Sequence, residues 1–330
     1  MASETDRPLA KAFESLFRSS EAIEYFIVDA FVGENCKGNP AAVVMLTEWK
    51  DEDWLQSVAA EFNLSETAYI VKKDKSSRNE EGNGQQVDSK EDSEHVIHEY
   101  DLRWFTPATE VSLCGHATLA SAYVLYHSGI VGKKDSIFFH TKGGLLSSRL
   151  VGPKETDAQA PTEDANTPKV ELVEMNFPWI TTTPAADSYV TALHDTLGTA
   201  KSVSLAKASN YLIVELETRE DMDKLKPNVQ ELLKCDSDGL LAIAPGGEGS
   251  GFDFVSRCFF PKLGVNEDPV TGSAHCILGP YWSSRCDKYD LLAHQVSQRG
   301  GILALHMDKK VGRVLLRGQA SISMAGVLVN

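Results

Sequence analysis

The sequence predicts an α/β protein built from two similar lobes, and three observations support that prediction. The chain has 330 residues, of which 42% are hydrophobic and 24% charged. A chain of this length and composition commonly folds as two globular domains. Short apolar runs typical of strands alternate with segments whose apolar residues recur at helical spacing. One sequence motif also recurs about 155 residues further along the chain.

The repeated motif is R-x-F-x-P, at residues 103–107 and 257–261. Each copy ends a predicted strand, and an acidic loop and a turn of small residues then open a predicted helix. The two turns are 114–118 (CGHAT) and 271–275 (TGSAH). Glycine lets backbone approach a ligand closely, and the first N–H groups of a helix lack internal partners. Ordinary capping would explain one copy, whereas two copies facing across a cleft predict a site for a small anion.

The first half of the chain contains four predicted strands and two predicted helices. The helix at 51–62 is amphipathic, because five apolar residues share one face and acids occupy its first turn. The five are Trp54, Leu55, Val58, Ala59 and Phe62. The helix at 116–127 carries apolar residues on several faces, which predicts a helix buried inside a sheet. The strands are predicted at 25–31, 41–46, 67–71 and 100–105, and a hairpin at 137–150.

The second half contains more short strands and ends in a meander. A helix is predicted at 273–287, with a kink or break at Pro280. Shorter helices are predicted at 187–197, 219–225 and 229–234. Strands are predicted at 170–177, 203–205, 211–216, 240–244 and 252–259, followed by 302–307, 311–317 and 320–328.

Two segments, 73–99 and 153–168, have almost no apolar residues and are predicted to be polar inserts. The expected organisation places a tail at 1–21, a first lobe at 22–145 and a second lobe at 146–309. The C-terminal strands are 310–330, and part of 262–287 is a candidate for packing in the first lobe.

The composition narrows the possible partners. The 32 Lys and Arg against 47 Asp and Glu give a net charge of −15, which disfavours nucleic acid and anionic membrane surfaces. No apolar run is long enough to span a membrane, and the acidic N-terminus resembles neither a secretory signal nor a transit peptide. Six cysteines without a CxxC pair and nine histidines without HExxH predict a cytoplasmic protein with free thiols and no metal site.

Five segments together resemble the PhzF, or phenazine biosynthesis-like, family over about residues 22–329. They are 38–40 (GNP), 63–68 (NLSETA), 103–107 (RWFTP), 114–118 (CGHAT) and 267–274 (EDPVTGSA), in the family's order. The resemblance implies the diaminopimelate epimerase-like fold, in which each of two lobes wraps a curved, barrel-like, mostly antiparallel sheet around a central helix. It also implies a homodimer, no cofactor and a site between the lobes. The best understood member isomerises trans-2,3-dihydro-3-hydroxyanthranilate by moving a proton along the ring.

The resemblance also implies the site residues. Glu66 matches the catalytic acid/base, and a desolvated carboxyl group can both take and return a proton. His116 is expected to bind the substrate or donate a proton, and Asp268 to pair with His116 or bind a substrate amine. Substrate contacts are expected from four further residues: Asn39, Gly115, Gly272 and Ser273.

The leading hypothesis is therefore a cofactor-independent isomerase of a small carboxylate. A racemase or epimerase would use one cysteine from each lobe, but here Cys114 faces Thr271, whose hydroxyl is too weak an acid to replace a thiol. A non-catalytic interaction protein that retains the cleft is a further alternative. Neither glycine-rich nucleotide motif is present, which disfavours a nucleotide-dependent enzyme.

Overall fold

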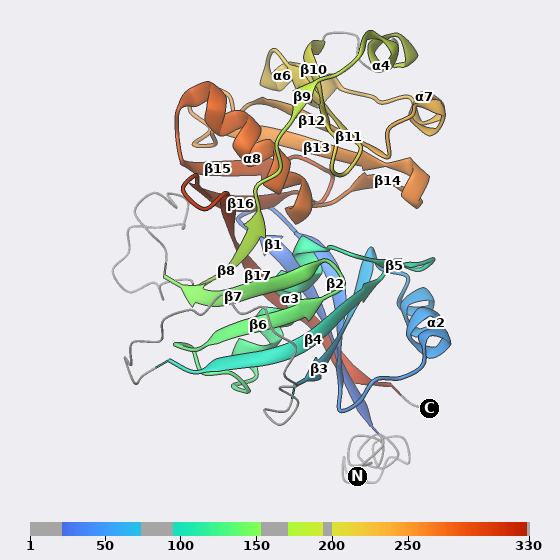
Figure 1. Cartoon of the computed structure of the whole chain (residues 1–330), viewed down its shortest axis with the longest axis vertical. Helices are drawn as coiled ribbons and strands as arrows, with labels where there is room; N and C mark the ends of the chain where they lie inside the picture. The colour runs from blue at the N-terminus through green and yellow to red at the C-terminus, as the bar shows by residue number, and fades with distance from the viewer. Residues whose placement is uncertain (1–21, 74–94, 153–170, 194–199, 329–330) are drawn as a thin grey trace, which may run out of the picture.

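The computed structural model describes residues 22–73, 95–152, 171–193 and 200–328. Two lobes lie one above the other, the first in blue and green and the second in yellow and orange (Figure 1). The predicted tail at 1–21, most of the insert at 73–99 and the insert at 153–168 lie outside the described residues. Among the described residues, none of the helices combines the length and the apolar composition needed to cross a bilayer.

The first lobe is a closed barrel of eight strands. All neighbouring strands are antiparallel except the parallel pairs β2–β3 and β4–β6. The first R-x-F-x-P motif lies at the end of a strand that starts at Ile97, inside the predicted polar insert 73–99. In order around the barrel the strands are β1 (Ile23–Val32), β2 (Asn39–Leu46), β3 (Glu66–Lys72), β4 (Ile97–Phe105), β6 (Ser136–Thr141), β7 (Gly144–Val151), β8 (Leu172–Pro178) and β17 (Arg313–Leu328).

Helix α3 (Gly115–His127) lies along the axis of this barrel, as the predicted buried helix requires. Eleven of its thirteen residues are buried, and it packs against β1, β2, β3, β7, β8 and β17. Apolar residues on all faces are the pattern of a helix surrounded by other elements. Outside the barrel, α2 (Glu52–Phe62) covers β3 and β4, and the short β5 (Glu110–Val111) pairs with β4.

The second lobe repeats this pattern of strand pairing. Its sheet again contains two parallel pairs, β11–β12 and β13–β15, among antiparallel neighbours. The strands are β9 (Thr183–Pro184), β10 (Ala200–Ala206), β11 (Tyr211–Leu216), β12 (Gly239–Pro245), β13 (Phe254–Phe260), β14 (Val265–Asp268), β15 (Asp290–Gln295) and β16 (Gly301–Asp308). The helices are α4 (Asp187–Ala192), α6 (Arg219–Lys224), α7 (Val229–Lys234), η3 (Pro261–Leu263) and α8 (Gly272–Cys286).

Helix α8 is the counterpart of α3 and packs against β12, β16 and β17, touching the first lobe at α3 and β8. It continues through Pro280 as one helical segment, so of the kink or break that the sequence predicts there, a break does not occur. Proline has no N–H to bond the carbonyl four residues earlier. That carbonyl, of Cys276, accepts instead from the backbone N–H of Ile180 at 3.0 Å. A neighbouring segment therefore satisfies the group that the proline leaves unpaired.

The strand β17 and the chain segment between β8 and β9 join the lobes. The start of β17, at 313–318, pairs with β16 of the second lobe and β8 of the first, whereas its later part pairs with β1. In Figure 1, β17 runs down from the second lobe and the chain after β8 runs up to β9. The sequence-based boundary after residue 145 falls inside β7, a strand of the first barrel. The structure confirms the predicted α/β fold of two similar lobes with curved sheets.

Candidate active site

A cleft of about 550 Å³ opens between the lobes. Of the residues predicted from the sequence, Glu66, Asp268 and Ser273 line it directly. The first lobe contributes mainly polar groups, and the second lobe contributes an apolar wall that includes Tyr211 and Phe260. Among the described residues that line the cleft there is no lysine or arginine.

Glu66 is brought to the cleft by the end of α2. Helix α2 begins at Asp51, whose side chain accepts from the backbone N–H of Trp54, and it ends at Asn63 in the left-handed conformation. Asparagine tolerates that conformation better than most residues. The chain then turns, and Glu66 is the first residue of β3, parallel to β2. Because Asn39 begins β2, Glu66 and Asn39 lie at the same end of two adjacent strands.

The two central helices meet at their N-termini, and glycine makes that contact possible. A Cβ atom added to Gly115 would lie 2.8 Å from the Cα atom of Gly272, and one added to Gly272 would lie 3.0 Å from the Cα atom of Gly115. Neither helix has a side-chain cap or an acidic residue in its first turn. The positive ends of both helix dipoles therefore point into the seam between the lobes.

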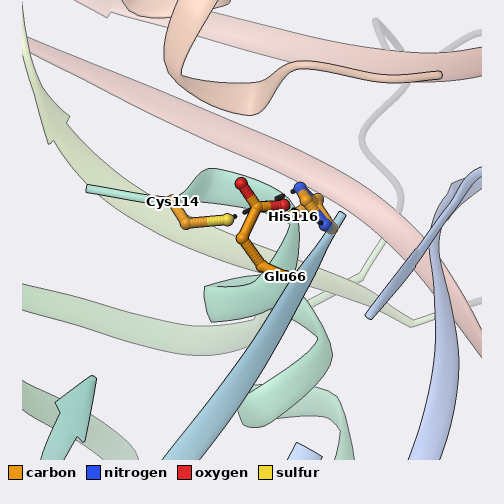
Figure 2. A group of neighbouring side chains, drawn as sticks. All are labelled: Glu66, Cys114 and His116. Carbon is orange, nitrogen blue, oxygen red and sulfur yellow. Dashed lines mark hydrogen bonds and ion pairs between the residues drawn. The ribbon is translucent and has the colours of Figure 1, made fainter. Parts of the chain in front are cut away.

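Three side chains converge beside this contact: Glu66, Cys114 and His116 (Figure 2). The Nε2 atom of His116 lies 3.2 Å from Oε2 of Glu66. The thiol of Cys114 makes a hydrogen bond to the Glu66 carboxyl group and lies 3.5 Å from Nδ1 of His116. His116 and Cys114 are buried, whereas Glu66 keeps about a fifth of its side chain exposed (19%).

Asn39 contacts the imidazole of His116. Its amide nitrogen lies 3.3 Å from Nδ1, and its two hydrogens are directed to Asp268 and the Val270 carbonyl, both at 2.9 Å. The amide nitrogen cannot accept a hydrogen bond, so this contact favours the neutral ring with its proton on Nε2, 3.2 Å from Oε2 of Glu66. Burial lowers the pKa of His116 to about 3, so the ring is neutral at physiological pH.

The Glu66 carboxyl group has the properties of a proton carrier. Burial, and secondarily the nearby charge of Asp268, raises its pKa to about 8, although the bond from Cys114 acts in the opposite direction. A carboxyl group with a pKa near the ambient pH is populated in both its acidic and its basic form. The arrangement therefore provides a group able to accept and return a proton at the cleft surface.

Asp268 lies across the seam and is held by both lobes. Its Oδ1 accepts from Asn39 of the first lobe at 2.9 Å, and its Oδ2 accepts from the hydroxyl of Thr271. Burial raises its pKa to about 6, while these two hydrogen bonds favour the charged form. The side chain of Gln295 donates to the Asp268 carbonyl at 2.8 Å. At neutral pH, Asp268 is mainly charged and Glu66 mainly protonated.

The structure brings the predicted residues together with two differences. Asp268 was expected either to pair with His116 or to bind a substrate amine, and it does not pair, because the Asn39 amide lies between the two side chains and contacts both. Gly115 and Gly272 contact each other, and the cleft lining includes neither of them. Sequence reasoning missed Gln295, since no local pattern marks a single glutamine on a distant strand.

The donor chemistry of Glu66, Cys114 and His116 fits a hydrogen-bonded network better than a metal site. Their ligand atoms lie within 4.8 Å of one another, a spacing that a zinc ion can bridge. However, burial raises the thiol pKa of Cys114 well above its usual value, and metals bind the thiolate. The proton on Nε2 also occupies the nitrogen that faces Glu66.

Known proteins are similar to this chain over most of its length. The chain is 38% identical to an uncharacterized isomerase of Halalkalibacterium halodurans over 297 residues, covering 89% of this chain and 94% of that protein. It is 37% identical to the human phenazine biosynthesis-like domain-containing protein, covering 92% and 98% of the two chains.

Solved structures show the same fold. A PhzF-family protein of Enterococcus faecalis superposes with a TM-score of 0.70 at 34% identity, covering 94% of this chain and all of that one. A hydroxyproline epimerase from Agrobacterium vitis superposes with a TM-score of 0.52 at 10% identity, covering 95% and 94%, and so shares the fold alone. These neighbours confirm the predicted diaminopimelate epimerase-like fold. The sequence profile of the phenazine biosynthesis-like protein family matches residues 28–326, and the chain belongs to that family.

Proposed function

We propose that this protein is a cofactor-independent isomerase of a small carboxylate, with Glu66 as the acid/base that moves the proton. The observation that carries the proposal is the Glu66 carboxyl group, which is partly open to the cleft, bonded to Cys114 and given a pKa of about 8 by burial. Family membership and relatives named as isomerases support the same reaction class.

In this mechanism, Glu66 removes a proton from a substrate carbon and returns it at another position. The charged Asp268 increases the basicity of Glu66 without competing for the same proton, because its own pKa is about 6. Two carboxyl groups with separated pKa values commonly divide such roles. His116 places its Nε2 atom 3.2 Å from Oε2 of Glu66, near enough to influence the carboxyl group, although these two atoms do not meet hydrogen-bond geometry.

The substrate carboxylate would lie against the uncapped N-termini of α3 and α8. Their free N–H groups and helix dipoles stabilise a negative charge, and the partly exposed Ser273 adds a hydroxyl group at the cleft surface. This placement sets a carboxylate next to the proton carrier, as removal of a proton from a neighbouring carbon requires.

The test is hydrogen exchange at carbon. Small amino- and hydroxycarboxylates are incubated with the protein in D₂O, and mass spectrometry measures deuterium bound to carbon. We expect at least one compound to exchange, and Glu66→Gln to lower the rate by roughly 10²-fold or more. Glu61→Gln, an exposed position on α2, is the matched control and should exchange at the wild-type rate. Undiminished exchange in Glu66→Gln contradicts the mechanism.

A racemase reaction through Cys114 is the second candidate, because this thiol contacts Glu66 and lies beside the seam. In the opposite lobe, Thr271 donates its hydroxyl proton to Asp268, so no second thiol stands opposite the first. Exchange that disappears in Cys114→Ser and survives in Glu66→Gln would select this candidate over the first.

A further inference from the structure

The turn that carries Asp268 contains a chain of hydrogen bonds with a fixed direction. It starts at Gln295, a side chain on β15 that is entirely buried. The Oε1 atom of Gln295 accepts from the backbone N–H of Thr271 at 2.8 Å, which identifies the other end of the amide as its nitrogen. That nitrogen has two hydrogens. They are directed to the carbonyl of Asp268 at 2.8 Å and to the hydroxyl oxygen of Thr271 at 3.2 Å.

The direction of the next bond follows from this count. A hydroxyl group has one proton. The Thr271 oxygen accepts from Gln295, and its own proton points toward Oδ2 of Asp268, while the Cys258 thiol is a second neighbour within hydrogen-bond reach. The other carboxyl oxygen accepts from Asn39, whose nitrogen also donates to the Val270 carbonyl. Both oxygens of Asp268 therefore receive a hydrogen bond from a neutral donor.

Among the described residues, no cationic side chain stabilises the Asp268 carboxylate. The titratable groups that influence or are influenced by Asp268 are Glu66 and Cys114 from the first lobe, and Tyr211 and Cys258 from β11 and β13. None of these side chains carries a positive charge, and neutral His116 is separated from Asp268 by Asn39. Within the described part of the chain, hydrogen bonds from neutral groups are what favour the Asp268 carboxylate.

We propose that Thr271 and Gln295 are positioning residues that keep Asp268 unprotonated, so that of these two carboxyl groups Glu66 is the one that carries a proton. The inference rests on the proposed role of Glu66, because only then does the location of this proton matter for turnover. Thr271 occupies the turn equivalent to that of Cys114, so the two lobes use the same turn differently. In the first lobe the Cys114 thiol contacts Glu66. In the second lobe the Thr271 hydroxyl contacts Asp268.

The first measurement is the infrared C=O stretch of protonated carboxyl groups at pH 7. Ordinary carboxyl groups are ionised at that pH. Among the described acids, only Glu66 and Asp268 have a raised pKa. We expect a protonated band in the wild type that Glu66→Gln abolishes. In the double variant Glu66→Gln with Thr271→Val, the band should reappear, because Asp268 then takes the proton.

The second measurement is the pH profile of deuterium exchange. Removal of the hydroxyl donor in Thr271→Val should let Asp268 become neutral, which lowers the pKa of Glu66 and moves the rising limb of the profile about half a unit or more toward acid. Thr271→Ser keeps the donor and should restore the wild-type profile. Gln295→Leu should act like Thr271→Val, provided that it retains the wild-type unfolding temperature.

The outcomes separate the two proposals. If the band does not reappear in the double variant, or if Thr271→Val and Thr271→Ser have the same profile, the positioning role is wrong. If the infrared results are as expected but Glu66→Gln exchanges deuterium normally, the positioning chain stands and the acid/base role of Glu66 fails.

Discussion

Replacing Gly115 with alanine tests whether the seam between the helix ends holds the site together. The new Cβ atom would lie 2.8 Å from the Cα atom of Gly272 and 3.1 Å from the backbone nitrogen of Ser273. Ordinary contacts begin near 3.4 Å, so the two backbones must separate by about 0.6 Å. Both neighbours are helix backbone, which cannot turn aside as a flexible side chain would.

A separation of that size would stretch the bond from Asn39 to Asp268, now 2.9 Å, to about 3.5 Å, beyond good hydrogen-bond geometry. Overpacking of this kind typically costs about 1–3 kcal/mol in the free energy of unfolding. We therefore expect Gly115→Ala to lower the unfolding temperature by several degrees and to reduce deuterium exchange more than tenfold.

Differential scanning fluorimetry and the exchange assay measure both effects in the same preparation. Gly152→Ala is the matched control, since a Cβ atom there meets nothing within 4 Å and the residue has no left-handed backbone. Gly272→Ala should behave like Gly115→Ala. A Gly115→Ala protein with the stability and exchange rate of the wild type would refute the view that the lobes are held at this contact.

Three further predictions follow from the same geometry. In Asp268→Asn the pKa of Glu66 should fall below about 8 but stay above 4.5, because burial, the larger cause, remains, so the exchange profile moves toward acid. Since a raised pKa means that the folded protein binds the proton more tightly, the wild type should lose stability as pH rises from about 4.5 to 8, and thermal scans of Glu66→Gln should show a smaller loss. Asn39→Ala removes the donor to Oδ1 of Asp268 and to the Val270 carbonyl and should lower the free energy of unfolding by about 1–3 kcal/mol in urea titrations. As a control, Asn266→Ala at an exposed position on β14 should change the free energy of unfolding little.

The repeated motif predicted the architecture well because its main contacts join residues that are close in sequence. The arginine of each R-x-F-x-P copy pairs with the acid of the following loop, Arg103 with Glu110 at 2.8 Å and Arg257 with Glu267 at 2.7 Å. Each arginine also lies 5.1 Å from the phenylalanine ring two residues later. Each copy of the motif therefore marks a unit of a strand, a loop and a helix, and the sequence contains this unit twice.

Other features could not be predicted, because they depend on contacts between distant segments. Pairing with His116, one of the two roles expected for Asp268, did not take account of Asn39, which reaches between them from β2. A break at Pro280, one of the two outcomes expected there, did not take account of Ile180, whose N–H satisfies the freed carbonyl. Neither partner is near in sequence, so no local pattern could indicate it.

The strand β17 makes the C-terminus indispensable to both lobes at once. Its first residues complete the second sheet beside β16, and its later residues complete the first barrel beside β1. A chain that ended at Asp308 would leave three strands without their β17 partner, β16 in the second lobe and β1 and β8 in the first, and such unpaired edges promote aggregation. Neither lobe can finish folding until this last strand is available. The two halves are therefore one cooperative unit, despite the internal repeat that makes each resemble an independent domain.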